Sequence, residues 1–315
     1  MIDVTSLTRF YGRNRAVDNV SFAIGDRAIV GLLGHNGAGK TTVMKMLSGF
    51  LEPTSGSIRI AGHDIETHRR EIQRKLGYLP ENLPVYPEMT IADYLDYAAG
   101  LKGLQGAAAQ RSIRRSVEAT ELGTRLFDPI GNLSRGFKQR VGVAQAILGE
   151  PELLILDEPG NGLDPQQNEH MRELIRELAS SATVILSTHI MQEVEALCDR
   201  VLVLASGALA LDESMDNLRA SQRLLLHASD EGGDLGAVLQ QLPQIDAVES
   251  LDAAAQQRAF ALRLQPGTDM DTAAGNVSRA VLDNGSRLFQ LLRERRDLEQ
   301  VFREAVQTAG GRHAA

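Results

Sequence analysis

The chain contains no tryptophan, one cysteine and few aromatic residues, which make up 4% of its 315 residues. A single cysteine cannot form an internal disulfide, so a disulfide-stabilised fold is excluded and Cys198 fits a reducing compartment. No apolar run in the sequence approaches the roughly 18 residues that a membrane-spanning helix needs. The opening segment, MIDVTSLTRF, lacks the basic and then apolar pattern of a signal peptide. We therefore expect a soluble protein that reaches a membrane only through a partner.

Positive charge is also in deficit. The chain has 33 basic and 41 acidic residues, which give a formal net charge of −8 and a pI near 5.5. Proteins that bind nucleic acid usually present a basic face, so nucleic acid is not an expected partner. Short basic clusters are interpreted instead as solvated helix faces, at Arg69-Arg70, Arg111–Arg115 and Arg293–Arg296.

The chain length predicts two domains. Residues 1–215 alternate apolar strands with amphipathic helices, which is typical of an α/β core around a largely parallel sheet. The alternation stops over residues 88–145, approximately. There Ile91–Leu104 and Ile113–Leu122 predict helices, so we expect a helical subdomain inserted in the core.

Residues 216–308 predict a small α/β accessory domain, and residues 309–315 a disordered tail. The last helix of this domain is expected to begin after Asp297, which can form a capping box with Gln300. The other predicted elements are strands at 223–228, 248–251 and 259–264 and helices at 235–242 and 270–282.

The most informative motif is Gly34–Thr42, GHNGAGKTT, which follows the apolar stretch Ile29–Leu33. It matches G-x-x-x-x-G-K-[ST], a loop whose backbone N–H groups surround a polyphosphate at the start of a helix. We expect Lys40 to contact the β- and γ-phosphates and the hydroxyl of Thr41 to bind Mg²⁺. The strand before the motif and the helical periodicity after it argue against an ordinary glycine-rich turn.

A second motif is the apolar run Leu153–Leu156 followed by Asp157 and Glu158. Two carboxylates at the end of a buried strand are costly unless a cation or a proton transfer uses them. We expect Asp157 to hold Mg²⁺ and Glu158 to act as the general base for the attacking water. The alternative is that one of the two carboxylates only caps a turn.

A third motif, LSRGFKQR, begins with Leu133-Ser134 and precedes an apolar-periodic helix. On its own, Ser134 is only an N-cap. Because the segment lies in the helical insertion, directly before the carboxylate strand and in a chain with a phosphate-binding loop, we interpret it as more than a helix cap.

The order of the phosphate-binding loop, a helical insertion, LSRGFKQR, LLILDEP, NGLDP and STH resembles the ATP-binding subunit of an ATP-binding cassette (ABC) transporter. The resemblance covers residues 1 to about 215. The sequence around these motifs is most similar to ATPase subunits of bacterial exporters, of the gliding-motility-associated and drug-export groups. Those subunits carry a small domain after the ATPase core.

This resemblance implies a P-loop NTPase fold of the ABC ATPase type, with ATP and Mg²⁺ as cofactors. It also implies that two ATPase subunits dimerise around two MgATP and power export by separate membrane-spanning permease subunits. The chain would then be peripheral, on the cytoplasmic face of the inner membrane.

The resemblance also implies residue roles. Catalysis would involve Glu158, His189 and Lys40, with His189 bridging the γ-phosphate and the water, and Thr41, Asp157 and Glu81 would bind the metal. Tyr11 would stack on adenine, although a tyrosine in a strand is usually a core residue. The other nucleotide-binding residues would be Gly34, Asn36, Gly37, Ala38, Gly39, Lys40, Thr41, Thr42, Ser134, Gly136 and Asp164, with Ser134 and Gly136 contacting the γ-phosphate of the opposite subunit.

The chain departs from the family pattern at three places. Arg135 and Phe137 stand where LSGGQ has glycine and glutamine. Before the Gly-Leu-Asp run, Gly160-Asn161 replaces the more usual Thr-Ser or Ser-Ala. Glu81 occupies the place of a metal-contacting glutamine. Glu81 either contacts the metal or its water, so that the segment around it relays this state to the membrane partner, or faces solvent.

Two other functions are weighed against this one. A soluble ABC ATPase of translation or DNA repair usually has two cassettes or a long coiled-coil insertion, and this chain shows one cassette and no heptad run. The LSRGF and STH segments disfavour a P-loop kinase or GTPase.

Overall fold

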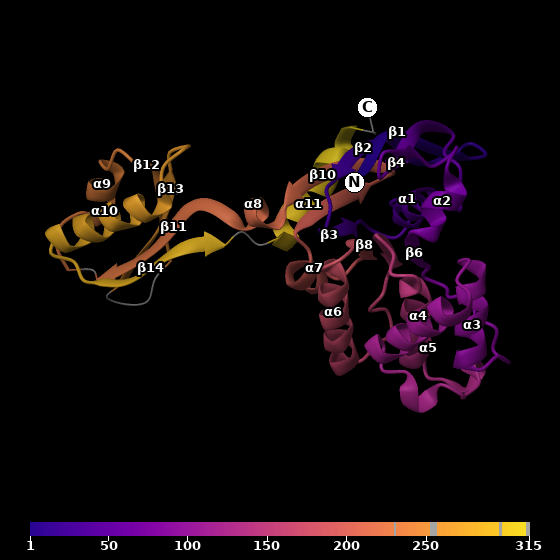
Figure 1. The fold of residues 1–315 in the computed structure, drawn as a ribbon. Coiled ribbons are helices and arrows are strands. Elements are labelled where there is room, and N and C mark those ends of the chain that lie inside the picture. The colour runs from indigo at the N-terminus through magenta and orange to yellow at the C-terminus, as the bar shows by residue number, and fades with distance from the viewer. Residues whose placement is uncertain (230, 253–256, 296–297, 313–315) are drawn as a thin grey trace. The chain divides into compact units, whose positions relative to one another are not determined.

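The computed structural model describes residues 1–229, 231–252, 257–295 and 298–312 (Figure 1). They form two compact units. The first comprises Met1–Met215 together with the segment from Phe302 onward, and the second comprises Asp216–Val301.

The first unit contains an antiparallel sheet of four strands in the order β2-β1-β4-β5. Along β1, Ile2, Val4 and Leu7 are buried while several residues between them are exposed, as expected for a sheet with one face in the core. The strands are β1 (Ile2–Tyr11), β2 (Asn14–Ile24), β4 (Ser55–Ile60) and β5 (His63–Asp64).

A second sheet of this unit has the strand order β10-β9-β3-β8-β7-β6, and its strands are parallel except β10. β3, β7 and β8 are buried along their whole length, which explains their continuous apolar sequences. The strands are β3 (Ile29–Leu33), β6 (Leu76–Leu79), β7 (Leu153–Asp157), β8 (Thr183–Thr188), β9 (Arg200–Ala205) and β10 (Ala208–Ser214).

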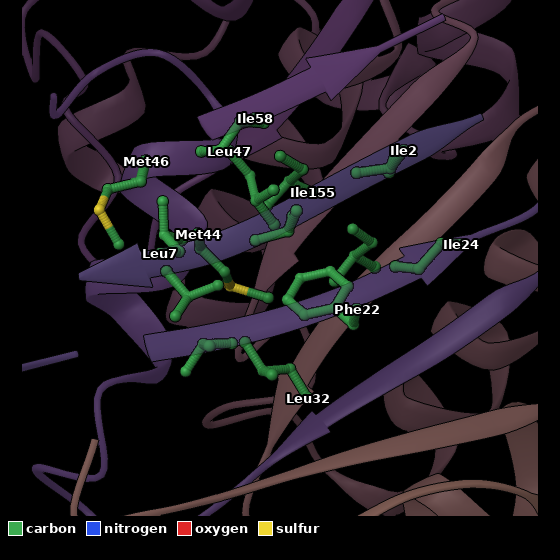
Figure 2. Close-up of a cluster of buried hydrophobic side chains, with 14 of the residues drawn as sticks. Ile2, Leu7, Phe22, Ile24, Leu32, Met44, Met46, Leu47, Ile58 and Ile155 are labelled. Carbon is green, nitrogen blue, oxygen red and sulfur yellow. The ribbon is translucent and has the colours of Figure 1, made fainter. Parts of the chain in front are cut away.

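Helix α1 (Lys40–Leu47) packs within the core that the two sheets share. Its residues Met44 and Leu47 are fully buried and cluster with Ile2 of β1 and Ile155 of β7 (Figure 2). Because side chains of both sheets hold α1, the loop that precedes this helix has a rigid support. Three further helices lie wholly in this unit and outside the helical subdomain, in the described part of the chain: α2 (Arg69–Arg74), α6 (Pro165–Ala179) and α7 (Met191–Leu197).

The helical subdomain has a core of its own, with Ile91, Leu95 and Val141 fully buried. It contains α3 (Ile91–Leu101), α4 (Gly106–Ala119), α5 (Arg135–Ile147) and the short 3₁₀ turns η1 (Gly123–Arg125) and η2 (Ile130–Asn132).

The helix predicted at residues 113–122 lies earlier, because α4 begins at Gly106 and ends at Ala119. Alanine has the highest helix propensity, so the run Ala107–Ala109 extends the helix toward its N-terminus. Glu121 has φ 55°, outside the helical range, so the helix cannot continue to Leu122.

The second unit is an antiparallel sheet of order β12-β13-β11-β14 with two helices. Its core includes Leu226 of the sheet and Val277 of a helix, both fully buried. Its strands are β11 (Ala220–Ser229), β12 (Ile245–Leu251), β13 (Gln257–Leu264) and β14 (Leu288–Arg295), and its helices are α9 (Leu235–Gln240) and α10 (Met270–Asp283). The short helix α8 (Met215–Arg219) precedes the sheet.

Two expectations for the C-terminal part are corrected. Residues 293–295 lie on β14 and not on a helix, because pairing with β11 satisfies the backbone of this segment. The expected disordered tail begins too early, because α11 (Leu298–Arg312) continues through residues 309–312. Once a helix is nucleated, each further residue adds a hydrogen bond, which outweighs the low propensity of Gly310-Gly311. Asp297 and residues 313–315 lie outside the described residues.

Candidate functional site

The loop 34–39 links β3 to α1, and its glycines make its shape possible. Gly37 and Gly39 have φ of 82° and 105°, which side chains rarely allow. A Cβ on Gly39 would lie 2.6 Å from the carbonyl oxygen of Ala16. The N–H of Ala38 donates to His35 O over 3.0 Å, which closes the turn. The loop therefore ends with backbone N–H groups at the start of α1, where an anion is favoured.

Lys40 is the first residue of α1, and it is 7% exposed. Its ammonium donates to Gly34 O at 2.7 Å and to His35 O at 3.5 Å. The charge is thus held over the loop by backbone carbonyls. A point charge in this place suits a triphosphate, since charge-assisted bonds to phosphate are stronger than neutral ones.

Asp157 ends β7 and is 1% exposed. Ser187 Oγ donates to Asp157 Oδ1 at 2.5 Å, whereas Asp157 Oδ2 is buried and has no partner among the described residues. A buried acceptor without a partner costs free energy that a cation would recover. Asp157 and Thr41 border the same cavity of about 590 Å³. An oxygen ligand set of this kind fits Mg²⁺.

Glu158 follows β7 with φ 52°, and its N–H donates to Ser187 O and Ser187 Oγ over 3.2 and 3.0 Å. Its carboxylate oxygens lie 3.1 and 3.0 Å from Nδ1 of His189. Burial raises the pKa of Glu158, while the hydrogen bond with His189 and the charge of Lys40 oppose this rise. A carboxylate with a raised pKa is a better proton acceptor near neutral pH.

The strand order explains why these residues meet. β8 lies between β3 and β7, and all three strands are parallel. Lys40, Glu158 and His189 therefore come from the carboxyl ends of adjacent strands, where ligands bind in open α/β sheets. His189 is 57% exposed at its side chain and Glu158 is 11% exposed, so the pair opens to solvent on the histidine side.

Glu81 is exposed after β6, and it borders the same cavity as Thr41 and Asp157. The hydroxyl of Tyr78 is buried in this region, and the pKa of Tyr78 is raised by burial and then by the charges of Asp157 and Glu81. The structure thus brings the three residues predicted to bind the metal to one cavity.

The LSRGF segment lies at the start of α5. Ser134 is the N-cap and accepts from the N–H of Phe137 at 3.4 Å. Gly136 is buried, and a Cβ there would lie 2.5 Å from Gln167 Oε1. No hydrogen bond of the described residues joins Ser134 or Gly136 to the loop 34–39.

Asp164 is the N-cap of α6 and forms a full capping box with Gln167. The side chain of Arg135 lies over Gly162, since a Cβ on Gly162 would meet Arg135 Nε. The residue that departs from the LSGGQ pattern thus contacts the segment before Asp164 in the same chain.

Tyr11 ends β1 and is 46% exposed, so it is not a core residue, and the guanidinium of Arg9 lies 5.1 Å from its ring centroid. Of the remaining predicted loop residues, Asn36 is exposed, Ala38 is buried and Thr42 is half-buried.

Two contributions are absent from the predicted site. Ser187 is fully buried and bonds both Asp157 and Glu158. Its hydroxyl, directly after the apolar run Val184–Leu186, could have indicated this role. Phe302 of α11 packs edge-on against His35 of the loop, with ring centroids 5.9 Å apart. No local pattern indicated this contact.

Comparisons with known proteins add to this geometry. A family model described as ABC transporter matches residues 17–161. A Bacillus subtilis (strain 168) protein named "Uncharacterized ABC transporter ATP-binding protein YxlF" is 36% identical over 248 residues, which are 79% of this chain and 82% of that protein. The bacitracin transport ATP-binding protein BcrA of Bacillus licheniformis is 38% identical over 228 residues, 72% of this chain and 74% of that protein.

A solved structure described as an ATP binding subunit of an ABC transporter is 32% identical and superposes with a TM-score of 0.64. The superposed region covers 69% of this chain and 91% of the chain in that structure.

Proposed function

This chain belongs to the ABC transporter family, as one of its ATP-binding and ATP-hydrolysing subunits, and from that premise we propose that two copies close around two MgATP and power export by separate membrane-spanning subunits. The observation that supports this most is the convergence of Lys40, Asp157, Glu158 and His189 at neighbouring strand ends.

The residues have distinct roles in this proposal. The loop N–H groups and Lys40 bind the phosphates, and Thr41, Asp157 and Glu81 would hold Mg²⁺, which supplies positive charge to the β- and γ-phosphates. Glu158 accepts a proton from the attacking water, and His189 orients Glu158 and contacts the γ-phosphate. Tyr11 stacks on the adenine, which its exposed ring permits.

The site is composite in this proposal. The N-terminus of α5, with Ser134 and Gly136, contacts the γ-phosphate that the opposite subunit holds. One observation supports this role: Ser134 caps the start of α5, and the N–H groups of the first turn of a helix are suited to an anion.

Export and membrane association rest on the relatives, one of which is named for bacitracin transport. From these relatives we propose that the chain lies on the cytoplasmic face of the membrane, bound to a permease. None of the helices in the described part of the chain combines the length and hydrophobicity needed to span a bilayer. Copurification tests this placement, because a tagged chain should recover a membrane-spanning protein from solubilised membranes. Recovery of the chain with ribosomes or DNA alone would contradict it.

We expect Glu81 to contact the metal or its water in the cavity that it shares with Thr41 and Asp157. Glu81→Gln keeps an acceptor oxygen, so we expect it to retain most ATPase and transport activity. Glu81→Ala removes the acceptor, so it should uncouple ATP hydrolysis from transport. The ratio of transported substrate to ATP hydrolysed in reconstituted vesicles measures this effect.

Glu88→Ala is a matched control for Glu81→Ala, since Glu88 is also exposed but does not border the cavity. A wild-type coupling ratio in Glu81→Ala would show that Glu81 only faces solvent and has no role at the metal.

The C-terminal part should not be required for ATP binding, because the proposed nucleotide residues all precede residue 190. We expect a chain ending at Asn217 to bind ATP with similar affinity.

Phe302→Ala isolates the ring contact with His35, and such a pair contributes about 0.5–1.5 kcal/mol. It should therefore change the Kd for ATP by no more than about tenfold. Loss of ATP binding in the folded truncated chain would show that the C-terminal part completes the site.

A further inference from the structure

Two histidines and a glutamate gather where the antiparallel sheet meets α2. His63 lies on β5, His68 directly precedes α2, and Glu71 is in the first turn of α2. One ligand atom of each side chain lies within 4.8 Å of those of the other two, and the two imidazole centroids are 5.0 Å apart. We propose that these three side chains bind a divalent transition-metal ion, namely Zn²⁺.

The spacing is close to what Zn²⁺ requires. Two ligands of a tetrahedral Zn²⁺, each about 2.1 Å from the metal, are about 3.4 Å apart. The three side chains are exposed, so small rotations about their side-chain torsions can close the remaining ångström or so. Three protein ligands leave the fourth position for water, the same ligand number as in open zinc sites.

Thr67 orients the ring of His68. Thr67 Oγ1 lies 2.8 Å from Nδ1 of His68 and 3.4 Å from the carbonyl oxygen of Asp64. In the metal-bound form that we propose, the hydroxyl donates its one hydrogen to Asp64 O and accepts from the Nδ1–H of His68, which leaves the lone pair on Nε2 for the ion. Histidines that bind metals typically have their other ring nitrogen held in this way.

Two of the three ligands border a cavity. His63 and Glu71 line a space of about 120 Å³, and His68 is not among the residues that line it. Lys75 borders the same cavity, but its ammonium is paired with Glu152 at 3.2 Å. Arg69 of α2 is likewise paired, with Glu52 at 2.6 Å, which reduces its repulsion of a cation.

The ligand set selects the class of ion. Imidazole nitrogens with one carboxylate suit Zn²⁺ and its neighbours in the transition series, whereas Mg²⁺ and Ca²⁺ prefer oxygen ligands. None of the three residues borders the cavity of Thr41, Asp157 and Glu81. This site is therefore separate from the one proposed for Mg²⁺. An ion here would link β5 to α2, so its binding should stabilise the first unit.

The experiment uses the full chain, stripped with a chelator and free of nucleotide and Mg²⁺, and titrated with Zn²⁺ by calorimetry. We expect one Zn²⁺ per chain and a higher thermal midpoint with Zn²⁺ than without it. His63→Gln, His68→Gln and Glu71→Gln should each weaken binding at least about tenfold. His170→Gln is the matched control, because His170 is exposed and lies 3.9 Å from a single carboxylate oxygen of Glu121.

Thr67→Ala tests the orientation of His68 without removing a ligand. It should weaken Zn²⁺ binding about tenfold, and Thr67→Ser should restore it. The wild-type chain failing to bind Zn²⁺, or binding that is equal in the three ligand variants and in wild type, would overturn the site. Circular dichroism of each variant shows that a loss of binding is not a loss of folding.

Discussion

Glu158→Gln should stop ATP turnover while ATP stays bound. The amide has the shape of the carboxyl group but cannot accept a proton, so the rate should fall by about 10²–10⁴-fold. Bound ATP that is not hydrolysed should hold two subunits together. Steady-state ATPase assays of the assembled transporter measure the rate, and size-exclusion chromatography with ATP measures the dimer.

The fold of this variant should not suffer. Burial raises the pKa of Glu158, so the folded state disfavours the ionised carboxylate, and this cost is present above the raised pKa and disappears as the pH falls through it. At pH 7 the glutamine variant should therefore have a thermal midpoint at least equal to that of wild type. Glu173→Gln, an exposed carboxyl on α6, should keep the wild-type rate. Hydrolysis by Glu158→Gln at the wild-type rate would show that another group is the base.

Lys40→Ala should abolish tight ATP binding. The ammonium would contact two phosphates, and a hydrogen bond to a charged group contributes about 1.5–3 kcal/mol. Loss of these contacts should raise the Kd for ATP by at least about 100-fold. Equilibrium binding of a fluorescent ATP analogue to the full chain measures this change.

The same substitution removes two bonds to the loop, since Lys40 donates to Gly34 O and His35 O. Thermal unfolding without nucleotide separates that effect from lost binding. Lys75→Ala removes a surface ammonium that pairs with Glu152, and it should leave the Kd unchanged. An unchanged ATP affinity in folded Lys40→Ala would refute the assignment of the loop.

Local patterns were sufficient for the elements of the site. The phosphate-binding loop is readable because a turn at Gly37 and Gly39 needs glycine, and the strand before Asp157 is readable because a buried parallel strand must be apolar throughout. Similar local rules predicted the caps Ser134 and Asp164. These features depend on a few neighbouring residues, so a single sequence contains them.

Other local patterns failed where the tertiary structure supplied the missing partner. β14 has little strand signal of its own and is a strand because β11 pairs with it. The position of Arg135 over Gly162 depends on the packing of α5 against the start of α6, which no spacing in the sequence expresses.

The sequence by itself determined which residues are candidates to bind phosphate, metal and proton, because backbone conformation, burial pattern and side-chain chemistry are local properties. Only the tertiary structure decided that they meet. The order β3-β8-β7 places Lys40, His189 and Glu158 at one edge, and Ser187 then bonds the two carboxylate residues. Strand order arises from the packing of a whole sheet against helices and a second sheet, and these contacts join residues far apart in the chain.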